Sequence, residues 1–200
     1  MKNFLHEKKL MEIIEKNNKN WGIKILVTWF SFILVFFLCF IFKDMAEIIG
    51  HFVAKYIPMV DKFIRQPTDI GDLPANYFAA LSILIPVFSL WIALGDDVLA
   101  RCRYGNSRLG RGKLETFVFV YVLSAPALAA IIYMAYFAPF SFSGPSKNFG
   151  QQLFILMLNT NIGLLVLGSF AGLVVSQIFV FLLWLFWLPI QYFFFNSLKE

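Results

Sequence analysis

Residues 153–195 read LFILMLNTNIGLLVLGSFAGLVVSQIFVFLLWLFWLPIQYFFF and contain no Asp, Glu, Lys, Arg or His. A helix over this stretch is roughly 60 Å long, about twice the thickness of the hydrocarbon core of a bilayer. In the whole chain 60% of the residues are hydrophobic and 14% are charged, whereas about a quarter are charged in soluble domains. The sequence therefore predicts an all-α integral membrane protein, with residues 25–195 as a single transmembrane domain.

The number of spans depends on how this stretch is arranged. One tilted helix over residues 161–185 gives a bundle of four spans, with residues 153–158 in the outer interface and the chain beyond Pro189 on the inner surface. A reversal at Ser176 and Gln177 gives five spans. Because no Gly-Pro or Asn-Gly turn marks a reversal there, four spans are favoured. The predicted spans are residues 25–42, 73–94, 116–137 and 161–185.

Charges outside the spans predict the orientation. Residues 1–24 hold six Lys and three Glu, a net charge of +3, and residues 95–113 hold five Lys or Arg and two Asp, also +3. Cytoplasmic loops are enriched in Lys and Arg, so both segments are predicted to be cytoplasmic. Residues 43–72 and 138–152 then form outer loops, and both termini, including the tail 196–200, lie in the cytoplasm.

The basic cytoplasmic segments are candidate contacts for a partner or for anionic lipid. In residues 1–24, an amphipathic arm that lies on lipid or docks a partner is as well supported as a solvated leader that only enforces orientation. The polar residues 16–20 are expected to interrupt its helix. Residues 105–113 contain Gly-x-x-x-x-Gly but lack the next Lys and the preceding strand of a phosphate loop, which favours a flexible basic loop. The candidate contacts are Lys8, Lys9, Arg101, Arg103, Arg108, Arg111 and Lys113.

An amphipathic helix is predicted in the first outer loop. Apolar residues recur there at helical spacing, and Asp44, Glu47, His51 and Lys55 occupy the other side. The helix is expected to end near Pro58 and to lie flat on the outer leaflet or in a small outer cap. Its apolar face comprises Ile48, Ile49, Phe52 and Tyr56.

A stripe of small residues, Gly168, Gly172 and Ser176, recurs at every fourth position of the last span. Small residues at this spacing let another helix approach closely. A single copy of so short a chain has little interior. The stripe is therefore predicted to be the interface of a homo-oligomer, either a dimer or a tetramer.

No residue pattern supports catalysis or cofactor binding. The two Cys and two His are spread along the chain and make no metal site. His6 and His51 are expected on opposite sides of the membrane, and neither lies beside a nucleophile. The predicted spans also lack the Asp, Glu, Lys, Arg or His that ion-coupled transporters usually place inside the bilayer. The sequence thus predicts a protein that is not an enzyme, has no cofactor and does not bind nucleic acid directly.

The order of the segments carries a resemblance to a known family. A basic leader precedes the first span, an outer loop contains Ile48, Phe52 and Tyr56, and the basic loop 101–113 is followed by a short outer loop at 141–148. In this layout the chain resembles the membrane subunit of the Kiwa anti-phage defence system. The resemblance implies a bacterial inner-membrane oligomer that senses phage attack and holds a soluble, DNA-associated effector on its cytoplasmic side. It assigns no functional residue.

Three classes of function follow from these features. The first is a membrane sensor and scaffold that recruits a soluble cytoplasmic effector, as the resemblance implies. The second is an immunity protein against a pore-forming bacteriocin, because the layout is also similar to colicin A-type immunity proteins. The third is a small channel or transporter subunit. The sensor and scaffold is the favoured prediction.

Overall fold

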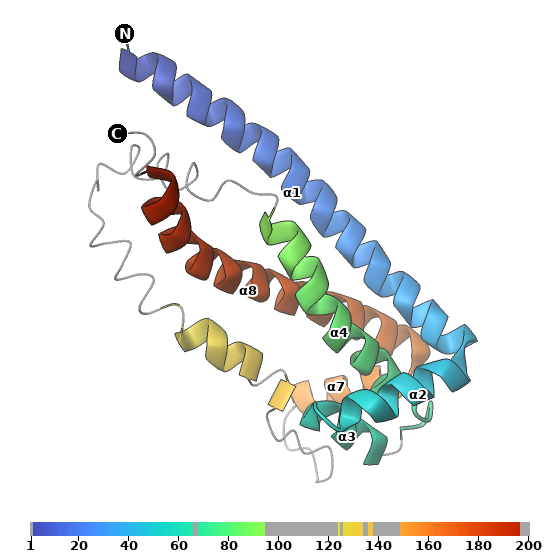
Figure 1. Ribbon diagram of the computed structural model, residues 1–200. Helices are drawn as coiled ribbons and strands as arrows, with labels where there is room; N and C mark the ends of the chain where they lie inside the picture. Colours follow the sequence, from blue (N-terminus) through green and yellow to red (C-terminus); the bar gives the residue numbers. More distant parts are fainter. Residues whose placement is uncertain are drawn as a thin grey trace.

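The computed structural model describes residues 2–65, 68–94, 124, 126–133, 136–137 and 149–196, and Figure 1 shows how their helices are arranged. No strand occurs among these residues, so the predicted all-helical architecture is confirmed for them. The helices are α1 (Lys2–Ile41), α2 (Lys43–Ala54), α3 (Pro58–Arg65), α4 (Leu73–Leu94), α7 (Phe149–Leu158) and α8 (Asn161–Asn196).

Three helices are long and apolar enough to cross a membrane. The qualifying segments are Met11–Ile41 in α1, Leu73–Leu94, which is the whole of α4, and Asn161–Phe186 in α8. Each covers all or nearly all of a predicted span. Half of the remaining predicted span, 116–137, lies outside the described residues. Within it, residues 126–133 are helical.

α1 is one continuous helix, so the predicted interruption at residues 16–20 is wrong. That segment contains only Lys and Asn, with neither Gly nor Pro. Lys is a good helix former, and Asn costs less than about 0.7 kcal/mol relative to Ala. Extending a helix that already exists requires no new nucleation, so the helix of the span continues through the polar residues. At 1.5 Å per residue, α1 is about 60 Å long.

α8 is also continuous and passes through Ser176 and Gln177 without a reversal. It ends at Asn196, later than the sequence predicted. A cap explains where it begins, because the backbone N–H of Gly163 donates a hydrogen bond to Oγ1 of Thr160 at 3.1 Å. This bond satisfies one of the donors left without a partner at a helix N-terminus. α7 is therefore separate from α8.

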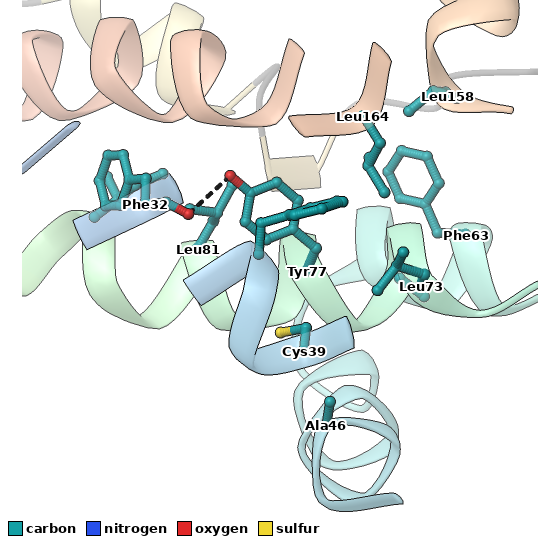
Figure 2. Packing of buried hydrophobic residues seen from close by; sticks show 12 residues of the cluster. Phe32, Cys39, Ala46, Phe63, Leu73, Tyr77, Leu81, Leu158 and Leu164 are labelled. Atoms are coloured by element: carbon teal, nitrogen blue, oxygen red, sulfur yellow. Dashed lines mark hydrogen bonds between the residues drawn. The ribbon is translucent and has the colours of Figure 1, made fainter. Parts of the chain in front are cut away.

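α4 is the centre of the bundle, since it contacts α1, α2, α3 and α8. In Figure 1 the N-terminal end of α1 and the C-terminal end of α8 lie at one end of the molecule, which we call the arm end. α2 and α3 lie at the opposite end, which we call the α2 end. Figure 2 shows the largest buried cluster, which includes Phe32, Phe36, Tyr77, Leu81 and Leu164.

α2 packs on α4 through small residues. Phe42 alone separates α2 from α1, and its backbone leaves the helical conformation, with φ −102° and ψ 56°. The buried positions of α2 are Ala46, Gly50 and Val53. A Cβ atom at Gly50 would collide with the side-chain oxygen of Asn76. Glycine at this position therefore sets how closely α2 approaches α4.

Candidate functional site

The stripe of Gly168, Gly172 and Ser176 packs inside the chain, which corrects its prediction as an oligomer interface. A Cβ atom at Gly168 would collide with the ring of Tyr77, and one at Gly172 would lie 3.2 Å from ring carbons of Phe32. Ser176 has no exposed surface. The spacing correctly indicated close approach of another helix, but the approaching helices are α4 and α1 of the same chain.

Tyr77 joins the three long helices at the α2 end. Its side chain is fully buried, and its hydroxyl donates a hydrogen bond to the backbone carbonyl of Phe32 in α1 at 3.1 Å, the dashed line in Figure 2. The Tyr77 ring also meets the ring of Phe36 edge to face, with the centroids 5.3 Å apart. On its other side the ring lies against Gly168 of α8. One side chain thus fixes α1, α4 and α8 relative to one another.

A second polar contact joins α4 to α8. The hydroxyl of Ser89 lies 2.6 Å from the carbonyl oxygen of Ile85 and 3.0 Å from that of Ser176. Its single hydrogen is therefore shared between a bond within α4 and a bond across to α8. Hydrogen bonds between membrane helices contribute about 0.6 kcal/mol on average. The Ser89 hydrogen bond therefore adds a small stabilisation to the association of α4 and α8, which rests mainly on the packing of small residues.

Lys24 holds α1 to the end of α4. Its Nζ donates a hydrogen bond to the carbonyl of Trp91 at 2.9 Å and lies 3.4 Å from the carbonyl oxygen of Ile92. It also lies 5.3 Å from the centroid of the Trp91 ring. The last four carbonyls of a helix have no partner within the helix, and a cation there is favoured by the helix dipole. Lys24 therefore caps the C-terminus of α4.

Aromatic side chains gather at the same level. The rings of Trp21 and Trp184 lie 6.4 Å apart, between α1 and α8. Trp184 is buried and belongs to a cluster with Val180 and Ile92. Tryptophan is enriched where membrane helices meet the headgroup region. The cation of Lys24 and these rings mark one level that crosses α1, α4 and α8.

The helix lengths beyond this level match a bilayer. α4 has 22 residues and is about 33 Å long. The corresponding parts of the other helices, Lys24–Ile41 of α1 and Asn161–Trp184 of α8, are about 27 Å and 36 Å long. A bilayer has a hydrocarbon core of about 30 Å. The packed part of the bundle therefore has the thickness of one bilayer.

On the other side of Lys24, α1 continues as an arm, residues 2–23, and most of the arm's described side chains are exposed. This part of the helix is about 33 Å long. The predicted contact Lys8 lies in it and is exposed, whereas the side chain of Lys9 lies outside the described residues. The five predicted contacts from Arg101 to Lys113 also lie outside them. Exposed charged side chains of the arm are Lys8, Glu12, Glu15, Lys16 and Lys19.

α2 presents three faces rather than the two expected from its sequence. The predicted apolar residues Ile48, Ile49, Phe52 and Tyr56 are all exposed, with Ile48 at 70%. The small residues described above face α4 instead. The charged face includes Glu47 and His51, whose Oε1 and Nε2 atoms are 3.8 Å apart. The sequence pattern located the apolar and charged faces but missed the third, because Ala and Gly add little to hydrophobic periodicity.

Within the part of the chain that the structure describes, no group of three or more His, Cys, Asp or Glu side chains is placed to hold a metal ion. The candidate functional features are a packed bundle with three helices able to cross a membrane, an arm with exposed charges, and an exposed apolar face on α2. No protein-family model, curated protein or solved structure matches the chain.

Proposed function

We propose that the chain is a non-enzymatic sensor and scaffold of the bacterial inner membrane, which recruits a soluble cytoplasmic effector in anti-phage defence. The observation that carries this proposal is the continuity of α1. A single helix joins the packed bundle to an arm whose charged side chains are exposed. An arm with this surface suits a protein partner on the cytoplasmic side better than it suits burial in the bundle.

The proposal includes four spans with both termini in the cytoplasm. The level of Lys24, Trp21 and Trp184 is then the inner interface, where Lys and Trp are expected. The fourth span comes from residues 116–137. Support for it comes from Tyr136, whose hydroxyl donates a hydrogen bond to the carbonyl of Ser82 in α4 at 3.3 Å.

The element proposed to sense the membrane is α2. Its exposed apolar side chains suit insertion among outer-leaflet lipids, while Glu47 and His51 remain in the headgroup region. α2 packs on α4 and is one residue away from α1. A disturbance of the outer leaflet that moves α2 would therefore act directly on the helix that carries the arm.

The defence role rests on the resemblance in segment order. Homo-oligomerisation, as a dimer or a tetramer, is part of the same proposal and needs an interface other than Gly168, Gly172 and Ser176. The two alternative functions, an immunity protein and a channel subunit, would give different results. The first would protect cells from one pore-forming bacteriocin, and the second would conduct ions in planar bilayers.

The test is co-purification with the soluble product of the neighbouring reading frame after co-expression. Two variants reverse cytoplasmic charge: one carries Lys8→Glu, Lys16→Glu and Lys19→Glu in the arm, and the other carries Arg→Glu changes in the basic loop. At least one variant is expected to lose the partner and the protection against phage. The loop positions to be changed are Arg101, Arg103, Arg108 and Arg111.

The matched control carries Lys43→Glu and Lys55→Glu, which change exposed lysines at the start of α2 and just after its end, at the other end of the bundle. It is expected to keep the partner. Retention of the partner by both cytoplasmic variants would refute the recruitment role. Conductance by the purified protein, or protection from a bacteriocin without any partner, would replace the proposal with the corresponding alternative.

A further inference from the structure

A cavity of about 130 Å³ lies between α3, α4, α8 and Tyr136. α4 contributes Phe78, Leu81 and Ile85 to its wall, and α8 contributes Ala171 and Val175. Ala171 and its neighbour Gly172, which also lines the cavity, have too little side chain to fill it. The space therefore exists because the residues of α8 at these two positions have little or no side chain.

Among the described residues, the side chains of the wall offer a water molecule only two hydroxyl oxygens, whose hydrogens are already donated elsewhere. Of the described residues that line the cavity, Ser82 and Tyr136 carry hydroxyl groups. Oγ of Ser82 donates to the carbonyl of Ala79 at 2.8 Å, and the hydroxyl of Tyr136 donates to the carbonyl of Ser82. A buried water needs two to four polar partners, and an apolar cavity of about 150 Å³ in another protein stays dry and binds benzene. An apolar occupant is thus favoured over water.

The position of the cavity indicates what that occupant is. Its wall begins at Ile57, between α2 and α3, and at Met59 in α3, and continues to Ile85 and Val175. Ile85 lies about 18 Å along α4 from its first residue, and Val175 lies about 21 Å along α8. The cavity therefore runs from the α2 end to past the middle of a bundle of bilayer thickness. At that depth the apolar molecule in excess is the acyl chain of a lipid.

We propose that this cavity is a binding site for the end of one lipid acyl chain, which enters at the α2 end. The chain would contact Phe78, Leu81 and Val175, and its headgroup would remain outside the bundle near α3. This inference uses only the membrane location of the three long helices. It holds whichever partner the arm binds, so its failure and the failure of the recruitment role are separate results.

The test is photolabelling in nanodiscs of phosphatidylethanolamine and phosphatidylglycerol. A small share of the phosphatidylethanolamine carries a diazirine at the end of one acyl chain, and labelled residues are identified by peptide mass spectrometry. The cavity residues Phe78, Leu81 and Val175 are expected to be labelled about as strongly as Ile83 and Val174, which face outward and are exposed. Labelling of the outward residues alone would overturn the proposal.

Filling the cavity tests the site directly. Ala171→Leu places a larger apolar side chain in the cavity. Labelling of the cavity residues is expected to fall by about tenfold, whereas labelling of Ile83 should change by less than about twofold. Val174→Leu, a change on the exposed face one turn away, is the matched control and is expected to alter neither. Unchanged labelling of the cavity in Ala171→Leu would refute the site. Should that variant fail to fold, Leu81→Ala enlarges the cavity instead, and labelling of Val175 must then rise.

Discussion

The contact between α4 and α8 differs from the arm of α1 in what keeps each helix in place. In the contact, Gly168 has a tyrosine ring where a side chain would be. In the arm, Gly22 has no atom within 4 Å of the position that a Cβ would take. The first region is determined by tertiary packing, and the second, apart from the contact of Trp21 with Trp184 at its base, by local helix propensity and continuation of the span. Glycine substitutions in the two regions should therefore act in opposite directions.

The largest effect is expected from Gly168→Ala. Its new methyl group would collide with the fully buried ring of Tyr77, and overpacking of this kind costs about 1–3 kcal/mol. The control, Gly22→Ala, should stabilise the arm by up to about 1 kcal/mol because alanine favours the helix. Unfolding in mixed SDS and dodecyl maltoside micelles, followed by tryptophan fluorescence, measures the first change, and circular dichroism measures the helicity of the second. Equal responses would contradict the comparison.

Tyr77→Phe isolates the polar part of the same contact. The ring remains, but the hydrogen bond to the carbonyl of Phe32 is lost, which should cost about 1 kcal/mol. Tyr56→Phe is the matched control, because Tyr56 is exposed in the turn that follows α2. The two variants are compared in the same micellar unfolding experiment. A loss as large in Tyr56→Phe would show that the buried bond contributes nothing specific.

Lys24→Met tests the boundary between the two regions. The substitution keeps a long apolar stem but removes the cation from the C-terminus of α4, where it contacts two carbonyl oxygens. The expected loss of stability is about 0.5–1 kcal/mol. Lys19→Met, at an exposed position of the arm, should have no measurable effect. Lys24→Arg should restore most of the stability, and failure to do so would argue that the contact depends on the ammonium geometry rather than on charge.

The smallest effect on the bundle is expected from Lys19→Pro. Proline inside a helix costs about 3 kcal/mol, but here it disrupts an exposed arm, so stability of the bundle should change by less than about 0.5 kcal/mol. Spin labels at Lys8 and Lys43 should report a broader distance distribution, and recruitment of the effector should fall. A sharp distance distribution would mean that contacts on the N-terminal side of residue 19 hold the arm in place.

Much of the bundle could be predicted from hydropathy. The ends of α4 coincide with the predicted span, and the continuity of α8 follows from an uncharged stretch with no Gly-Pro or Asn-Gly turn at Ser176 and Gln177. The prediction of α1 failed at residues 16–20, because a polar composition was treated as a helix break. A polar stretch without Gly or Pro can remain helical, and its side chains are then exposed to solvent.

The details of the site depend on tertiary placement, which sequence patterns do not specify. The spacing of Gly168, Gly172 and Ser176 indicates that some helix comes close, but it does not distinguish α4 from a second copy of the chain. Lys24 is likewise a flanking lysine in the sequence, and only the arrangement of helices brings it to the end of α4. The cavity beside Ala171 results from the same arrangement and leaves no pattern in the sequence.

The unbroken α1 has a mechanical consequence. If Lys24 acts as a pivot at the end of α4, the arm beyond it is a rigid lever of about 33 Å. A tilt of the span by about 10°, well within the range that membrane helices adopt, would displace the tip of the lever by roughly 6 Å. That displacement exceeds one helical turn, which is enough to separate a charged side chain from a bound partner. The length of the arm therefore acts as an amplifier of small movements inside the bilayer.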